Sequence, residues 1–125
     1  MIQHYFDVSD DILRVTYTGE VTMAEFNEFG TFLMHNTQLP RSLNILVDAR
    51  NAAYDFSESE IEVVIPKMQK HVKPYLQVNM AMVHGKPVET AYSMLMGKKS
   101  RVPNLRQAVF ASENAALGWL YKYSQ

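Results

Sequence analysis

The stretch that decides the fold is Leu43-Asn44-Ile45-Leu46-Val47-Asp48. It is apolar at most positions, whereas a strand with one wet face would alternate apolar and polar residues. A run that is apolar on both faces is typical of a central strand that helices cover on both sides. Residues 78–84 form a second run of this kind, so we expect two neighbouring buried strands.

Helices should separate these strands. Two begin with capping boxes, in which a Ser or Thr and a Glu three residues later satisfy each other's backbone donors: Thr22 with Glu25, and Ser57 with Glu60. The first helix should reach about residue 36. The second contains Pro66, which predicts a kink or a split helix, because proline removes a backbone donor and clashes with the preceding turn. A third helix is expected over 87–97, with Pro87 at its first position, and a fourth after Ser112.

The remaining segments complete an α/β domain. Residues 3–8 and 12–18 predict a hairpin, residues 108–111 a fifth strand, and residues 50–56 an irregular loop. Strands that alternate with helices pair in parallel through right-handed crossovers. We therefore expect a mostly parallel five-stranded sheet with an antiparallel N-terminal hairpin strand and four flanking helices, in the order β-β-α-β-α-β-α-β-α. The whole chain, 1–125, should be a single domain.

Composition excludes several classes of protein. A net charge of -1 gives no basic field for nucleic acid, and the absence of cysteine removes disulfides and thiolate chemistry. The first residues lack the pattern of a signal peptide, and the apolar runs are too short to span a bilayer, so we expect a cytoplasmic protein. The chain has eight methionines, which indicate a wide core face, a dimer contact or an apolar pocket.

Candidate ligand-binding residues follow the two central strands, since ligands of open α/β sheets bind beyond the carboxyl ends of the strands. They are Asp48, Arg50, Tyr54, Asp55, His84 and Lys86. Each also has a structural interpretation: an Asp at a strand end often bonds loop N–H groups, a lone His often packs, and Gly85-Lys86 suits a tight turn. A P-loop is excluded, because Met80 and Pro87 occupy positions that require glycine and a hydroxyl residue.

No catalytic motif is present. The chain has no G-x-S-x-G elbow, no G-x-G-x-x-G turn and no H-E-x-x-H pair, and its four histidines are far apart. An acid–base enzyme would need Asp48, His84 and Lys86 to converge. We expect a protein that is not an enzyme, with no cofactor and no metal.

Several soft motifs resemble a known family. They are TGEVTMAEF (18–26), LVDAR (46–50), DFS (55–57), MAMV (80–83), and VF (109–110) followed by AALGWL (115–120). The chain resembles the STAS-like family along nearly its whole length, close to the anti-sigma-factor antagonists and the STAS/SEC14-like group. The resemblance implies a four- or five-stranded sheet with helices packed around it.

The resemblance also implies a phosphorylation switch. The antagonists carry Asp-x-Ser-Gly after the third strand, and the serine is phosphorylated. Asp48 matches that motif, but Arg50 replaces the serine and Asn51 the glycine. Ser57 is the nearest serine; a phosphate there would suit a helix N-terminus, yet capping explains this serine without phosphorylation.

Two functions follow as hypotheses. The first is a regulatory module that contacts a protein partner or a second copy of itself. The alternative, which SEC14-like kinship implies, is a carrier or sensor of a small lipid-like or anionic ligand at the carboxyl edge of the sheet.

Overall fold

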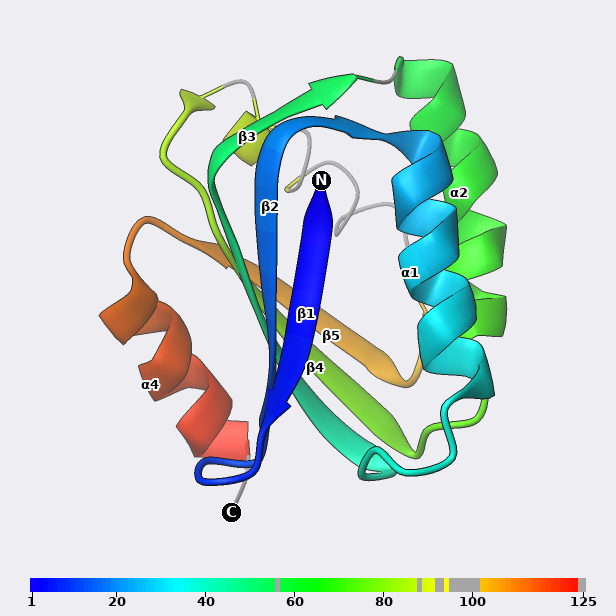
Figure 1. Cartoon of the computed structure of the whole chain (residues 1–125), viewed down its shortest axis with the longest axis vertical. Helices are drawn as coiled ribbons and strands as arrows, with labels where there is room; N and C mark the ends of the chain where they lie inside the picture. Colours follow the sequence, from blue (N-terminus) through cyan, green and yellow to red (C-terminus); the bar gives the residue numbers. More distant parts are fainter. Residues whose placement is uncertain (56, 88, 92–93, 95–101, 124–125) are drawn as a thin grey trace.

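A computed structural model describes residues 1–55, 57–87, 89–91, 94 and 102–123. Its centre is a five-stranded sheet whose strands lie side by side in chain order (Figure 1). The bounds are β1 (Ile2–Asp7), β2 (Ile12–Thr22), β3 (Ser42–Asp55), β4 (Gln77–Val83) and β5 (Leu105–Phe110). β1 pairs antiparallel with β2, and every other pairing is parallel. The expected fold class is confirmed, with β3 at the middle.

The strand β3 is longer than the sequence indicates. The loop expected over residues 50–56 is wrong for residues 50–55, which continue β3; of these, 51–55 pair with Thr18–Thr22 of β2. A one-residue register shift between Thr16 and Thr18 separates this second half of the pairing from the first, and such a bulge re-aims the side chains that follow. Gly19 adopts φ 64° beside the shift, a conformation that favours glycine.

Helices cover both faces of the sheet (Figure 1). α1 (Met23–His35) and α2 (Glu58–Val72) lie on one face, and α4 (Glu113–Tyr123) packs on the other against β4. Both expected capping boxes are present, and Ser112 Oγ accepts from the Ala115 N–H at the start of α4. No described helix has the length and apolar character that a bilayer span requires.

The expectation that Pro66 could split the second helix is wrong, since α2 runs through it unbroken. Pro66 lies on the exposed side, while Ile61 and Val64 are buried on the other. Packing of that apolar stripe stabilises the helix against the local cost of the proline. The expected third helix lies partly outside the described residues; 87, 89–91 and 94 are helical.

The core has two layers, one on each side of β3. Leu43, Ile45 and Val47 pack toward α1 and α2, and Leu46 packs with Leu120 of α4. Burying a side chain of this size contributes about 1.5–3 kcal/mol. The apolar run at residues 43–48 therefore forms part of the central strand and is covered by helices on both faces, as expected.

Candidate functional site

The carboxyl ends of β3 and β4 bring two of the six predicted residues together. The Tyr54 hydroxyl and His84 Nε2 share a hydrogen bond of 3.1 Å, whose donor depends on the His84 tautomer. His84 is only 3% exposed, and burial lowers its pKa, an effect that Glu89 partly opposes. The imidazole is therefore neutral at pH 7 and positions the Tyr54 ring.

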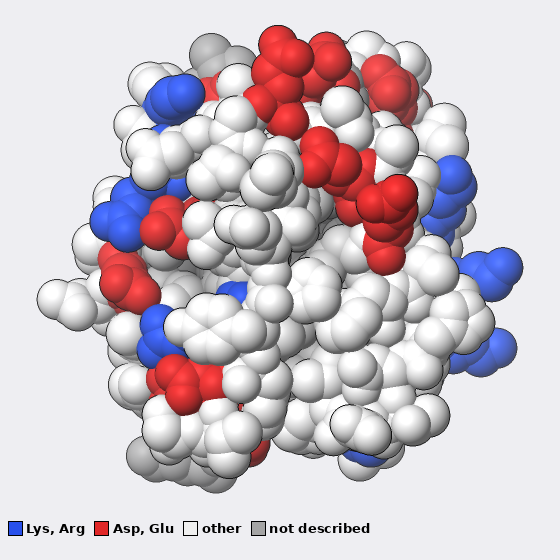
Figure 2. Space-filling model, viewed as in Figure 1, with Lys and Arg blue, Asp and Glu red and all other residues white. Residues whose placement is uncertain are grey.

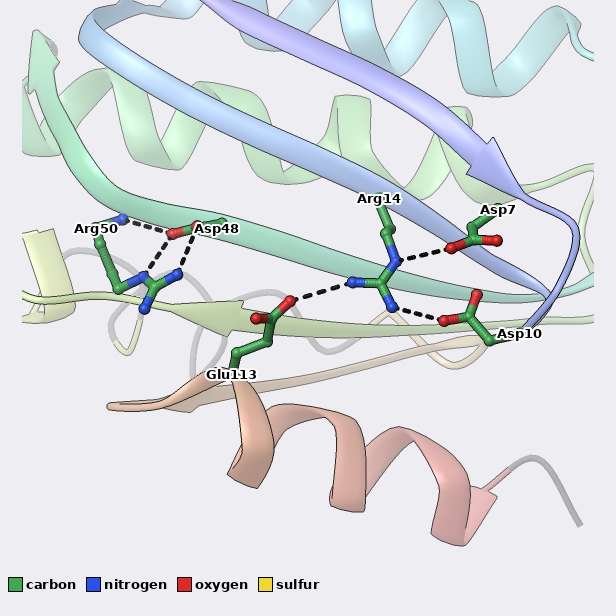
Figure 3. A network of polar contacts seen from close by, with 6 residues as sticks. All are labelled: Asp7, Asp10, Arg14, Asp48, Arg50 and Glu113. Carbon is green, nitrogen blue, oxygen red and sulfur yellow. Dashed lines mark hydrogen bonds and ion pairs between the residues drawn. The ribbon is translucent and has the colours of Figure 1, made fainter.

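Asp48 and Arg50 form a pair of their own at the same edge (Figure 3). Arg50 Nε and Nη2 donate to the two carboxylate oxygens of Asp48 at 3.0 and 2.9 Å, and the Arg50 N–H donates to Oδ1. These donors hold the pKa of Asp48 below its ordinary value. Because the guanidinium fork is engaged by Asp48, a bound anion would have to compete with a bidentate carboxylate.

Lys86 and Asp55 do not join either pair. Lys86 Nζ lies 3.5 Å from the Ala52 carbonyl oxygen, and Asp55 is exposed at the last position of β3. Figure 2 shows acidic side chains gathered toward the top of the view, where β3 ends and α2 begins. Their negative field opposes the binding of an anion at this edge.

Ser57 is the N-cap of α2. Its Oγ accepts from the Glu60 N–H at 3.4 Å, and the Ser57 N–H donates to Glu60 Oε1 at 2.9 Å. This geometry accounts for the serine as a cap, and its phosphorylation stays a prediction. Among the described residues, no three His, Asp or Glu side chains are arranged to hold a metal ion.

A second polar cluster lies on the α4 face and was not foreseen (Figure 3). Arg14 of β2 forms ion pairs with Asp7, Asp10 and Glu113 at 3.4, 2.6 and 3.1 Å. The hydrogen bond and the charge of Asp10 raise the pKa of the guanidinium, and Glu113 adds to the effect. The cluster ties the β1–β2 hairpin to the start of α4, so we assign it a structural role.

The other face of the sheet carries an apolar cavity, which lies between the sheet and the helices α1 and α2. Its enclosed volume is about 70 Å³, and the site measures about 660 Å³ when its mouth, which is open to solvent, is included. The described lining residues are Tyr17, Phe26, Phe29, Gly30, Leu33, Tyr54, Val64, Met68, His71, Val72, Met80, Met82, Leu105 and Gln107. Of the six predicted site residues, only Tyr54 is among them.

Aromatic rings form one wall of the cavity. Phe26 lies edge-on to both Tyr17 and Tyr54, with ring centroids 5.4 and 5.8 Å apart. Tyr17 is 2% exposed, and burial raises the pKa of its hydroxyl well above the ordinary value, with Tyr54 adding to the effect. The hydroxyl is therefore neutral, and this wall carries no charge.

The opposite wall depends on a close approach of α1 and α2. A Cβ built on Gly30 of α1 would overlap with the imidazole ring of His71 on α2. Burial lowers the pKa of His71, and Lys67 and Lys70 lower it further. Gly30 thus makes room for a neutral imidazole at the cavity, a role that the sequence pattern alone did not reveal.

Comparison with known proteins identifies the fold. No protein-family model matches the sequence, and no curated protein matches it. Among the solved structures that match is one that is similar over 95% of this chain and 93% of its own, with a TM-score of 0.63 and 17% identity. It is an uncharacterised protein of the DUF3478 family from Shewanella loihica PV-4, described as having a SpoIIAA-like fold.

The chain therefore has a SpoIIAA-like fold, the fold of STAS-like anti-sigma-factor antagonists. This confirms the resemblance at the level of fold, as the motifs in β2, β3 and β4 indicated.

Proposed function

We propose that this chain is a non-enzymatic module that binds a small apolar molecule in the cavity between α1, α2 and the sheet. The observation that carries the proposal is the cavity itself, which is lined mainly by aromatic and aliphatic side chains from both helices and four strands. Genuine apolar cavities exclude water and take apolar guests; one of about 150 Å³ holds benzene. The enclosed space here is about 70 Å³, smaller than that, so an aromatic guest must also occupy the open mouth, with which the site measures about 660 Å³.

The proposal modifies the ligand hypothesis drawn from the sequence. That hypothesis placed a lipid-like or anionic ligand at the carboxyl edge, near Arg50 and Lys86. The Asp48–Arg50 pair and the acidic surface of that edge favour the apolar choice over the anionic one. Tyr54 links the carboxyl edge to the cavity, because it is the next-to-last residue of β3 and also lines the cavity.

The side-chain contacts support a binding role over catalysis. Asp48 is held by Arg50, His84 bonds Tyr54, and the Lys86 ammonium faces a backbone carbonyl. Each of the three groups that an acid–base mechanism would need has a separate structural neighbour. That arrangement suits a carrier or sensor.

Contacts with a partner protein or a second copy are the second candidate function. The observation in favour is that Tyr5 and Val8, in and beside the edge strand β1, are exposed large apolar residues. Isolated exposed apolar residues are common on monomers, so the cavity ranks first. Light scattering coupled to gel filtration tests this candidate: a dimer that Tyr5→Ser and Val8→Ser together dissociate would support it, and a strict monomer would count against self-association.

A neutral dye tests the primary proposal. N-phenyl-1-naphthylamine fluoresces more strongly in apolar surroundings, and we expect saturable binding to the wild-type protein. The matched variants are Val64→Phe and Val63→Phe on α2. Val64 is 5% exposed and lines the cavity, whereas Val63 is 60% exposed.

Val64→Phe should weaken dye binding at least about ten-fold, because the larger ring enters a packed space. Val63→Phe should leave binding unchanged. Thermal unfolding of both variants checks that each is folded. Absence of saturable binding to the wild type, or equal binding to both variants, would contradict the proposal.

A further inference from the structure

The cavity lining includes one polar side chain, that of Gln107, with no evident structural role. Gln107 of β5 is among the lining residues and lies beside Met80 in the β4–β5 pairing. Its Nε2 donates to the sulfur of Met82 at 3.3 Å. Its Oε1 is buried and has no hydrogen-bond partner among the described residues.

The contact with Met82 fixes the orientation of the amide. A thioether sulfur accepts hydrogen bonds and cannot donate, so the amide nitrogen faces it and the oxygen points elsewhere. Most buried side-chain oxygens have a partner, and a buried acceptor without one destabilises the protein unless water or a ligand satisfies it. Gln107 therefore offers an unpartnered acceptor within a mostly apolar site.

The rest of the lining sets the charge of the guest. No described lining residue is Asp, Glu, Lys or Arg, so an ionised guest would lose its hydration without gaining a counter-ion. His71, the titratable ring in the wall, has a pKa lowered by burial and is neutral at pH 7. The cavity consequently favours an uncharged molecule.

We infer that the ligand is a neutral, mainly apolar molecule with one hydrogen-bond donor, a hydroxyl or an N–H, that bonds Gln107 Oε1. This inference rests on the proposed function and specifies its ligand class. A few fixed polar groups in an apolar pocket typically set the orientation of the guest, and Gln107 holds that position here.

Indole and benzofuran are matched probes, since they have nearly the same shape and only indole carries an N–H donor. Calorimetric titration should show indole binding about ten-fold more tightly to the wild-type protein, the effect expected of one net hydrogen bond. In Gln107→Met, which keeps length and apolar volume, the two probes should bind within about two-fold of each other. The preference for indole over benzofuran is measured on the wild-type protein alone, so the test still stands if Gln107→Met does not fold.

The outcomes separate the two claims. Equal binding of both probes to the wild type would overturn the donor requirement and leave apolar binding intact. Failure of both probes, together with failure of the naphthylamine dye, would overturn the proposed function. A preference for indole that persists in folded Gln107→Met would show that another acceptor receives the donor, and would also overturn the inference.

Discussion

Substitution of Gly30 by alanine tests the helix packing that shapes the cavity. A Cβ at this position would lie 2.6 Å from His71 Cγ and closer still to two other ring atoms. Ordinary carbon contacts are about 3.5–4.0 Å, so the ring or the helix must move by roughly an ångström. Overpacking of this kind costs about 1–3 kcal/mol.

A second effect acts in the opposite direction. Alanine in place of glycine stabilises a helix interior by about 0.5–1 kcal/mol. We therefore expect Gly30→Ala to lower the free energy of unfolding by up to about 2 kcal/mol, or to leave it nearly unchanged. Gly118→Ala in α4 is the matched control, because a Cβ there meets nothing within 4 Å. The control should gain the full helical benefit of about 0.5–1 kcal/mol.

Urea unfolding followed by the fluorescence of Trp119, the only tryptophan, measures both variants. A double-mutant cycle with His71→Ala isolates the clash. In that background Gly30→Ala should stabilise the protein as Gly118→Ala does. If Gly30→Ala stabilises the wild-type chain as much as Gly118→Ala, the close approach of α1 and α2 is not as described.

Three further expectations follow from the polar groups. Arg14→Met should destabilise the protein by about 1–3 kcal/mol at neutral pH, because three carboxylates lose their shared cation. The loss of stability, measured by urea unfolding, should be smaller at pH 3, and an equal loss at both pH values would refute the charge explanation. Tyr54→Phe should cost about 1–2 kcal/mol through the lost bond to His84, whereas an unchanged midpoint would mean that the bond is not formed. The pKa values of His71 and His84 are lower in the folded state, so the unfolded chain binds more protons below about pH 6.5. Stability should therefore fall as the pH is lowered from about 7.5 to about 5.5. A midpoint of thermal unfolding that does not change with pH would refute the burial of these rings.

The fold could be predicted because its signals are local and redundant. The apolar run 43–48 indicated a doubly covered strand, and two capping boxes marked the starts of α1 and α2 within one residue. The second half of β3 was missed because Asn51-Ala52-Ala53 lacks the β-branched pattern of a strand. Its pairing with β2 depends on a register shift, a tertiary feature that one strand's sequence does not encode.

The candidate site was predictable only in part. The rule about strand ends correctly drew attention to Tyr54 and His84, which bond each other. The cavity was missed because its lining comes from α1, α2 and four strands, and each residue by itself resembles ordinary core. The number of methionines and the glycine at position 30 were the available signals of a cavity. Neither specifies which faces of α1, α2 and the sheet come together.

The most direct test of apolar binding uses the methionines as reporters. In protein labelled with ¹³C at the methionine methyl groups, N-phenyl-1-naphthylamine should shift the signals of Met68, Met80 and Met82, which line the cavity. Met1 and Met94 are 59% and 61% exposed and should not move. Shifts confined to the exposed methyl groups, or no shifts at saturating dye, would contradict the account.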